Sequence, residues 1–131
     1  AGRAELVREV ADAALQIAGQ AVQSAAPTEG TALEALRRIL LSLTQSGAEH
    51  RPLLLLGITH DAEFLAGRAE VLTPIAEVLR RGVSTGELRA DLDPVWAQHA
   101  LLSLLQTAVL VEHPDAAEAV LSSLIEGWRP R

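Results

Sequence analysis

The chain contains no cysteine, and it also lacks lysine, methionine, tyrosine and asparagine. Without cysteine it forms no disulfide, binds no metal through thiolates and carries no cysteine nucleophile, although the redox compartment stays open. All eleven basic residues are arginine. We interpret this bias as a property of the genome rather than as a functional signal.

Aromatic side chains and positive charge are both scarce. The chain has two tryptophans and one phenylalanine, and its net charge at pH 7 is −6. Because phosphate groups repel a negative protein, this chain is not expected to bind DNA, RNA or an anionic membrane by itself. Its 131 residues, 49% of them hydrophobic, suffice for one globular domain with a sizeable core.

The uncharged segment at residues 94–111 is long enough to raise the question of a membrane span. Five polar residues inside it argue against exposure to lipid. The start of the chain carries charges where a signal peptide has its apolar region. We therefore expect a soluble, cytoplasmic protein. The five polar residues are Gln98, His99, Ser103, Gln106 and Thr107.

Every segment has the apolar periodicity of an α-helix, and none has the two-residue alternation of a strand. We expect a single all-α domain over residues 1–131, an antiparallel bundle of about six helices. The helices are predicted at about 3–25, from 31 onward, at 68–84, at 94–111 and from 115 onward, with a buried helical turn or two at 53–58.

Local signals mark where the helices begin. Thr31-x-x-Glu34 matches a capping box, Asp93-Pro94 supplies an N-cap and a proline at the first helical position, and Asp115-x-x-Glu118 is predicted to cap the last helix. Pro74 falls inside the 68–84 segment, so either that helix is kinked there or it starts at Thr73 as its N-cap. The buried stripe expected there is Val71, Leu72, Ile75, Val78 and Leu79.

The helix at 94–111 has two contrasting sides. Its apolar arc covers roughly 220°, wider than the ~100° stripe of an ordinary surface helix. The remaining face is uncharged and carries polar and aromatic side chains, which is the composition of a ligand pocket. A polar seam in a dimer interface and an uncharged strip facing solvent remain as alternatives. With contributions from the preceding segment, the predicted ligand-binding residues are His60, Phe64, Trp96, His99, Ser103 and Gln106.

The apolar sides of the last two helices predict self-association. An uncharged helix beside an amphipathic one exposes more apolar area than a monomer ordinarily does, so we expect a homodimer. The alternative is that the internal core of the chain covers these residues. The predicted interface residues are Ala97, Leu101, Leu104, Ala108, Val111, Val120, Leu124 and Trp128.

The segment RGVSTGELRADLDP at residues 81–94 is the most distinctive in the chain. It resembles the turn before the penultimate helix of tetracycline-repressor-type (TetR family) transcriptional regulators, and the apolar helix, the break and the final amphipathic helix follow in the order of that family. Residues 49–54 and 2–7 are also similar to segments of such proteins. The resemblance implies a TetR-like C-terminal domain that binds a small, largely apolar effector and dimerises through its last two helices.

The N-terminal helix-turn-helix of that family is absent from this chain, which agrees with its acidic charge. The resemblance therefore implies the regulatory part of a repressor, in which the effector controls DNA binding by the missing part. Arg3 would either contact DNA phosphate in the intact protein or be a solvated arginine at a helix start. The alternative from another class is a stand-alone helical interaction module without a ligand.

An enzyme is not expected. The sequence has no H-E-x-x-H, phosphate-loop or G-x-S-x-G motif, and its four histidines are scattered. Ser103 and His99 form a local pair on one helix without any oxyanion donor in view. We therefore expect no catalytic residue, no metal and no cofactor.

Overall fold

The computed structural model describes residues 2–51 and 62–130, and all the secondary structure in this part of the chain is helical. This confirms the predicted all-α class. Six helices are seen within these ranges: α1 (Arg3–Ser24), α2 (Ala32–Glu49), α4 (Ala62–Val71), α5 (Thr73–Ser84), α6 (Pro94–Leu110) and α7 (Ala116–Trp128). The turn predicted at 53–58 lies outside the described residues.

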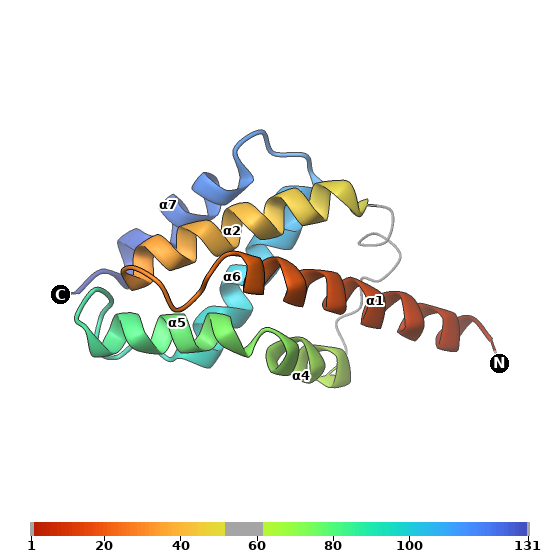
Figure 1. Ribbon diagram of the computed structural model, residues 1–131, viewed down its shortest axis with the longest axis horizontal. Helices are drawn as coiled ribbons and strands as arrows, with labels where there is room; N and C mark the ends of the chain where they lie inside the picture. Colours follow the sequence, from red (N-terminus) through yellow and green to blue (C-terminus); the bar gives the residue numbers. More distant parts are fainter. Residues whose placement is uncertain (1, 52–61, 131) are drawn as a thin grey trace.

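Helix α2 lies in the middle of the bundle. It packs against α1, α5, α6 and α7, and α6 in turn packs against α4, α5 and α7. In Figure 1, α2 crosses the molecule with α7 above it, α1 and α5 below it and α6 behind it. The apolar spacing of α2 explains this position, because its inward stripe of Leu36, Ile39 and Leu40 is at most 1% exposed.

Two predicted N-caps are confirmed. The Thr31 hydroxyl accepts the Glu34 N–H at 3.1 Å, and the Glu34 carboxylate accepts the Thr31 N–H at 3.2 Å, which completes the capping box of α2. The Asp93 carboxylate accepts the N–H of Val95 at 3.0 Å and that of Trp96 at 3.3 Å. Both motifs therefore fix the helix starts that the sequence predicts.

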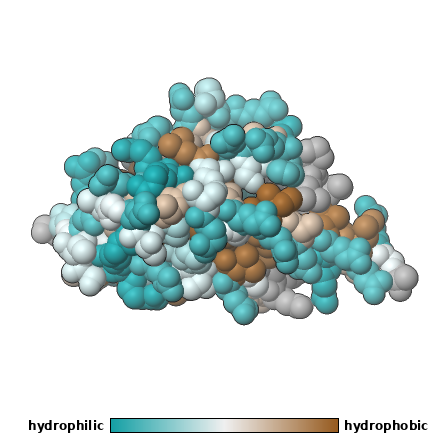
Figure 2. All heavy atoms as spheres, viewed as in Figure 1, coloured by the Kyte–Doolittle hydropathy of each residue, from teal (hydrophilic) through white to brown (hydrophobic). Residues whose placement is uncertain are grey.

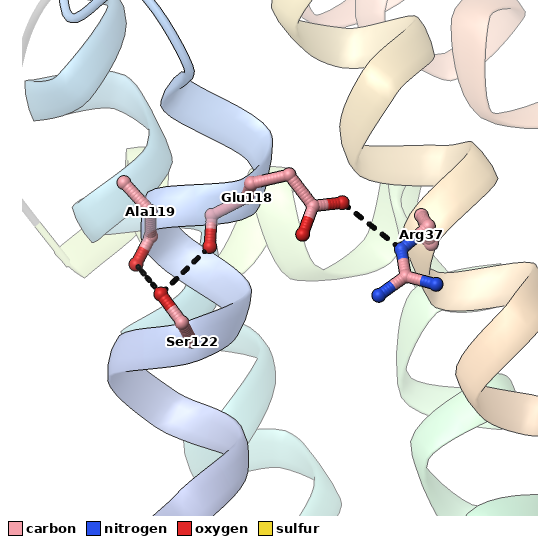
Figure 3. Close-up of polar contacts among 4 residues, drawn as sticks. All are labelled: Arg37, Glu118, Ala119 and Ser122. Atoms are coloured by element: carbon pink, nitrogen blue, oxygen red, sulfur yellow. Dashed lines mark hydrogen bonds and ion pairs between the residues drawn. The ribbon is translucent and has the colours of Figure 1, made fainter.

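The predicted cap of the last helix does not form. Asp115 occupies the N-cap position of α7, but its carboxylate makes no capping hydrogen bond. Glu118 instead turns to Arg37 of α2, with 3.0 Å between the carboxylate and Nε, as Figure 3 shows. Both side chains are more than half exposed, so the pair contributes about 0–1 kcal/mol to stability.

The 68–84 segment is not one kinked helix: its first residues belong to α4, and α5 begins at Thr73. The break falls at Leu72, which is the N-cap residue of α5 in place of Thr73. The Thr73 hydroxyl instead donates to the carbonyl oxygens of Ala69 and Glu70, and so satisfies the end of α4. Because the helical phase changes at the break, Val71 is 42% exposed, and its predicted burial is wrong.

The turn between α5 and α6 packs closely against α5. Leu88 is 2% exposed and lies over Gly82, where a Cβ atom would come within 2.7 Å of the Leu88 side chain. The Leu88 N–H donates to the Gly82 carbonyl at 3.0 Å. Gly86 has a φ of +81°, which a residue with a side chain rarely adopts. Steric constraints therefore favour glycine over larger residues at both positions.

The residues beside Leu88 bind the ends of two other helices. The Glu87 carboxylate accepts the N–H groups of Ala32 at 3.1 Å and Leu33 at 3.2 Å, at the start of α2. The Arg89 N–H donates to the Trp128 carbonyl at 2.7 Å, near the end of α7. These groups would otherwise lack intrahelical partners. The distinctive turn of the sequence thus joins α5, α2 and α7.

Among the described residues, no helix is long and apolar enough to cross a membrane.

Candidate functional site

A cavity of about 120 Å³ lies between α1, α2, α4 and α6. Its walls are mainly apolar, with a few polar side chains among them. About 10–15 Å³ of such volume admits one water, so the cavity has room for a small organic molecule. The lining residues are Ala14, Leu15, Ile17, Ala18, Leu43, Ser46, Gly47, His50, Arg68, Leu72, Leu102, Leu105, Gln106 and Val109.

Small residues make the space. Ala14 and Ala18 are one turn apart on α1, and Gly47 faces the same cavity from α2. Larger side chains at these positions would fill the gap, which Leu43 and Leu105 also line. Small side chains on α1 and α2 therefore leave a gap at this level of the bundle.

Among the described lining residues, Arg68 is the only arginine, and none is acidic. It is 6% exposed, and its Nη2 donates to Nδ1 of His99 and to the Ser103 hydroxyl, both at 3.3 Å. Because arginine only donates, Nδ1 of His99 is the acceptor in this hydrogen bond. Burial lowers the pKa of Arg68, although an arginine remains charged at neutral pH.

The Arg68 cation has no acidic partner among the side chains that the structure describes. Its Nε atom is buried and makes no hydrogen bond within the same set. A buried charge without a counter-charge is costly, and proteins usually pair it. Arg68 is therefore the polar feature of the cavity that most needs a functional explanation.

The predicted ligand-binding residues divide into three groups. Gln106 lines the cavity, while His99 and Ser103 reach it only through their contact with Arg68. Trp96 is 68% exposed and does not line the cavity, because it lies on the outer side of α6. His60 and the Phe64 side chain lie outside the described residues, although the backbone of Phe64 belongs to α4.

Sequence reasoning missed most of the cavity, including every wall residue of α1 and α2. One signal was available for Arg68, because it precedes the buried Leu72 by one helical turn and so lies on an inward-facing stripe. A charged residue at such a position indicates either a buried pair or a binding site. The alanines of α1 gave no comparable signal, since alanine is common in any helix.

The predicted dimer interface also requires correction. Ala97, Leu101 and Val120 are at most 1% exposed and pack in the core of this chain, so they present no surface to a partner. Leu104 and Val111 are exposed. The remaining three predicted residues, Ala108, Leu124 and Trp128, are half-buried at the edge of the core.

An uncharged surface remains on α6, which we call the outer face of α6. Its exposed large side chains include Trp96 at 68%, Leu104 at 37% and Val111 at 68%. The side of the molecule seen in Figure 2 is largely hydrophilic, with hydrophobic residues in small separate patches. The outer face of α6 consists of Trp96, Ala100, Ser103, Leu104, Thr107 and Val111.

No group of three or more histidine and acidic residues that could hold a metal ion occurs among the described residues. The cavity itself has no acidic lining residue in the described part of the chain. Mainly apolar walls with a few polar groups are the usual composition of a small-molecule pocket.

The fold has a counterpart among solved structures. The chain is similar to a TetR family transcriptional regulator, PfmR from Thermus thermophilus, with a TM-score of 0.69 and 24% sequence identity. The likeness covers 92% of this chain and 73% of that one. The models of protein families and the curated proteins gave no match. The predicted TetR-like fold is thus confirmed.

Proposed function

We propose that this chain is the effector-binding and dimerisation domain of a TetR-like transcriptional regulator. A small, largely apolar molecule occupies the cavity, and the segment that precedes α1 in the intact regulator binds DNA. The TetR-like fold supports the regulatory role, and the net charge of −6 is consistent with assigning DNA contact to another part of the protein.

One observation carries this proposal: α1 forms a wall of the cavity and also extends away from it. Residues 14–18 of α1 supply four of the lining side chains. Figure 1 shows the N-terminal part of α1 projecting beyond the other helices, and residues 2–6 there are exposed. A molecule that fits one position of α1 better than another would shift the population towards it and move the projecting end.

The outer face of α6 supports a homodimer. It contains no charged residue, and three of its large hydrophobic side chains are exposed to solvent. The neighbouring helix α7 has small residues at Ala119, Ser123 and Gly127, whose spacing places them on one side of the helix and allows a partner helix to approach closely. Two copies that join through α6 and α7 would remove this apolar area from water and place both α1 helices in one symmetric molecule.

The effector-binding role can be tested by filling the cavity from α1. Ala14 lines the cavity and its neighbour Ala13 is exposed, so Ala14→Phe and Ala13→Phe add the same side chain inside and outside. With benzoate and benzamide as probes, we expect saturable amide chemical-shift changes at residues 14–18 and 102–109 in the wild type and in Ala13→Phe. Ala14→Phe is expected to lose them.

Thermal unfolding of both variants checks that the Ala14→Phe domain is folded under the conditions of the titration. Absence of any shift in the wild-type domain, with either probe, would contradict the effector-binding role directly. That outcome would leave a helical interaction module as the better explanation of the fold.

A further inference from the structure

We propose that the cavity binds an organic anion, a molecule with an apolar body and a carboxylate that pairs with Arg68. This inference rests on the proposed effector-binding role and adds the chemical class of the effector. Its starting point is the buried cation in a cavity whose other walls are mainly apolar.

The first step concerns charge. Arg68 is 6% exposed and, among the described side chains, has no carboxylate partner. The described lining residues include no acidic side chain. With a neutral occupant the guanidinium would have no counter-ion among the described residues, and a cationic occupant would add like-charge repulsion. An anionic occupant would offset the cost of burying this charge.

The second step concerns hydrogen bonds. The described partners of Arg68 are the His99 ring and the Ser103 hydroxyl, and both bind the same atom, Nη2. The Nε–H group is buried and finds no acceptor among the described residues. A guanidinium matches the planar geometry of a carboxylate, and its hydrogen bonds to an anion are stronger than those to neutral groups. A carboxylate oxygen of the effector would satisfy the Nε–H group.

The third step concerns the rest of the molecule. Apart from Arg68 and a few other polar side chains, the cavity is lined by aliphatic residues such as Leu15, Ile17 and Val109. Such walls favour a hydrocarbon or aromatic body and offer no partners to a polar chain. His99 and Ser103 hold Arg68 against α6, so the charged group stays in place before an effector arrives. A preorganised cation reduces the ordering cost of binding.

The test compares an acid with its amide. Benzoate and benzamide have nearly the same size and shape and differ in charge, so isothermal titration measures the contribution of the charge. We expect the wild-type domain to bind benzoate about tenfold or more tightly than benzamide. Arg68→Gln should abolish this preference, and Arg68→Lys, which keeps the charge but not the planar fork, should retain part of it. The control Arg80→Gln removes an exposed arginine that does not line the cavity and should retain all of it.

The outcomes distinguish failure of the anionic ligand class from failure of the effector-binding role. If neither probe binds, the effector-binding role itself fails. If benzamide binds as tightly as benzoate, the role stands and the anionic class is wrong. The wild-type comparison decides this even if Arg68→Gln does not fold, because it needs no variant. Preference for benzoate in Arg68→Gln would also overturn the assignment to Arg68.

Discussion

At the scale of single residues, the described polar contacts range from neighbours in sequence to residues far apart. The capping box of Thr31 and Glu34 joins residues three positions apart, which is why the sequence predicts it. Glu87 and Ala32 are 55 positions apart, and Arg68 and His99 are 31 apart. Pattern reasoning identifies a helix start, but it cannot identify partners that only the packing of helices brings together.

Gly82 offers a prediction at this scale. Its missing side chain makes room for Leu88, and a Cβ atom would also lie 3.3 Å from that of Ala32. Alanine gains ~1 kcal/mol over glycine inside a helix. Overpacking a buried site costs about 1–3 kcal/mol. We therefore expect Gly82→Ala to lower the free energy of unfolding, measured by urea denaturation.

The matched control is Gly67→Ala in α4. A Cβ atom at Gly67 meets nothing within 4 Å, so only the gain in helix propensity remains, and stability should stay equal or rise by up to ~1 kcal/mol. Equal effects of the two substitutions would show that Leu88 yields to the added methyl group, contrary to the steric explanation.

At the scale of elements, the sequence predicts which segments form helices better than which residues each helix buries. The periodicity of α6 places Leu101 on a buried side and Gln106 towards the cavity, but Leu104 and Val111 of the predicted apolar arc are exposed. It does not reveal that α2 and α5 cover Ala97 and Leu101, because the same apolar arc fits an internal core and a dimer interface equally well. The cavity needs side chains from four helices, so no single segment carries its signature.

The start of α2 depends on another element. Its first turn is capped from outside by the Glu87 carboxylate, which the Thr85 hydroxyl also contacts at 2.8 Å. Glu87→Gln retains an acceptor but loses the charge that favours a helix N-terminus. We expect it to cost roughly 0.3–1 kcal/mol of stability at pH 7. Glu77→Gln, on the exposed side of α5, should cost less.

The dependence on pH gives this prediction a second readout. Burial alone would raise the pKa of Glu87, but hydrogen bonds from Thr85 and from the N–H groups of Leu33 and Ala32, together with the Arg81 charge, outweigh it and lower the pKa. A lowered pKa in the folded state means that the stabilisation is complete above the ordinary carboxyl range and is lost as the pH falls through the folded value. Wild-type stability should therefore fall more steeply below about pH 4.5 than that of Glu87→Gln. Parallel curves would argue against a charged cap.

At the scale of the whole molecule, the cavity, α1 and the outer face of α6 form one arrangement. The cavity touches the middle of α1, and α6 contributes its inner side to the cavity and its outer side to the proposed dimer. Occupancy of the cavity would therefore be linked to the position of each α1 helix relative to its copy. In the proposed regulator, this linkage would let the occupant of the cavity control two DNA-binding heads, whose spacing must match the DNA helix.

The absence of cysteine allows a direct measurement of this linkage. Ala4→Cys places a single spin label on the exposed end of α1, and double electron–electron resonance then measures the distance between the two labels of a dimer. We expect a defined distance in the unliganded protein and a shifted distribution at saturating benzoate. A label on exposed Glu77→Cys should shift less, since α5 contributes no lining residue.

The interface is tested in the same labelled protein. Leu104→Glu introduces two buried charges into a symmetric contact on the outer face of α6, which should dissociate the dimer and remove the dipolar signal. Leu41→Glu, at a leucine of α2 that is 52% exposed, carries the same change outside that face and should leave the signal intact. A signal that survives Leu104→Glu would place the interface elsewhere. A wild-type distance that does not change at saturation would exclude α1 as the moving element while leaving the dimer in place.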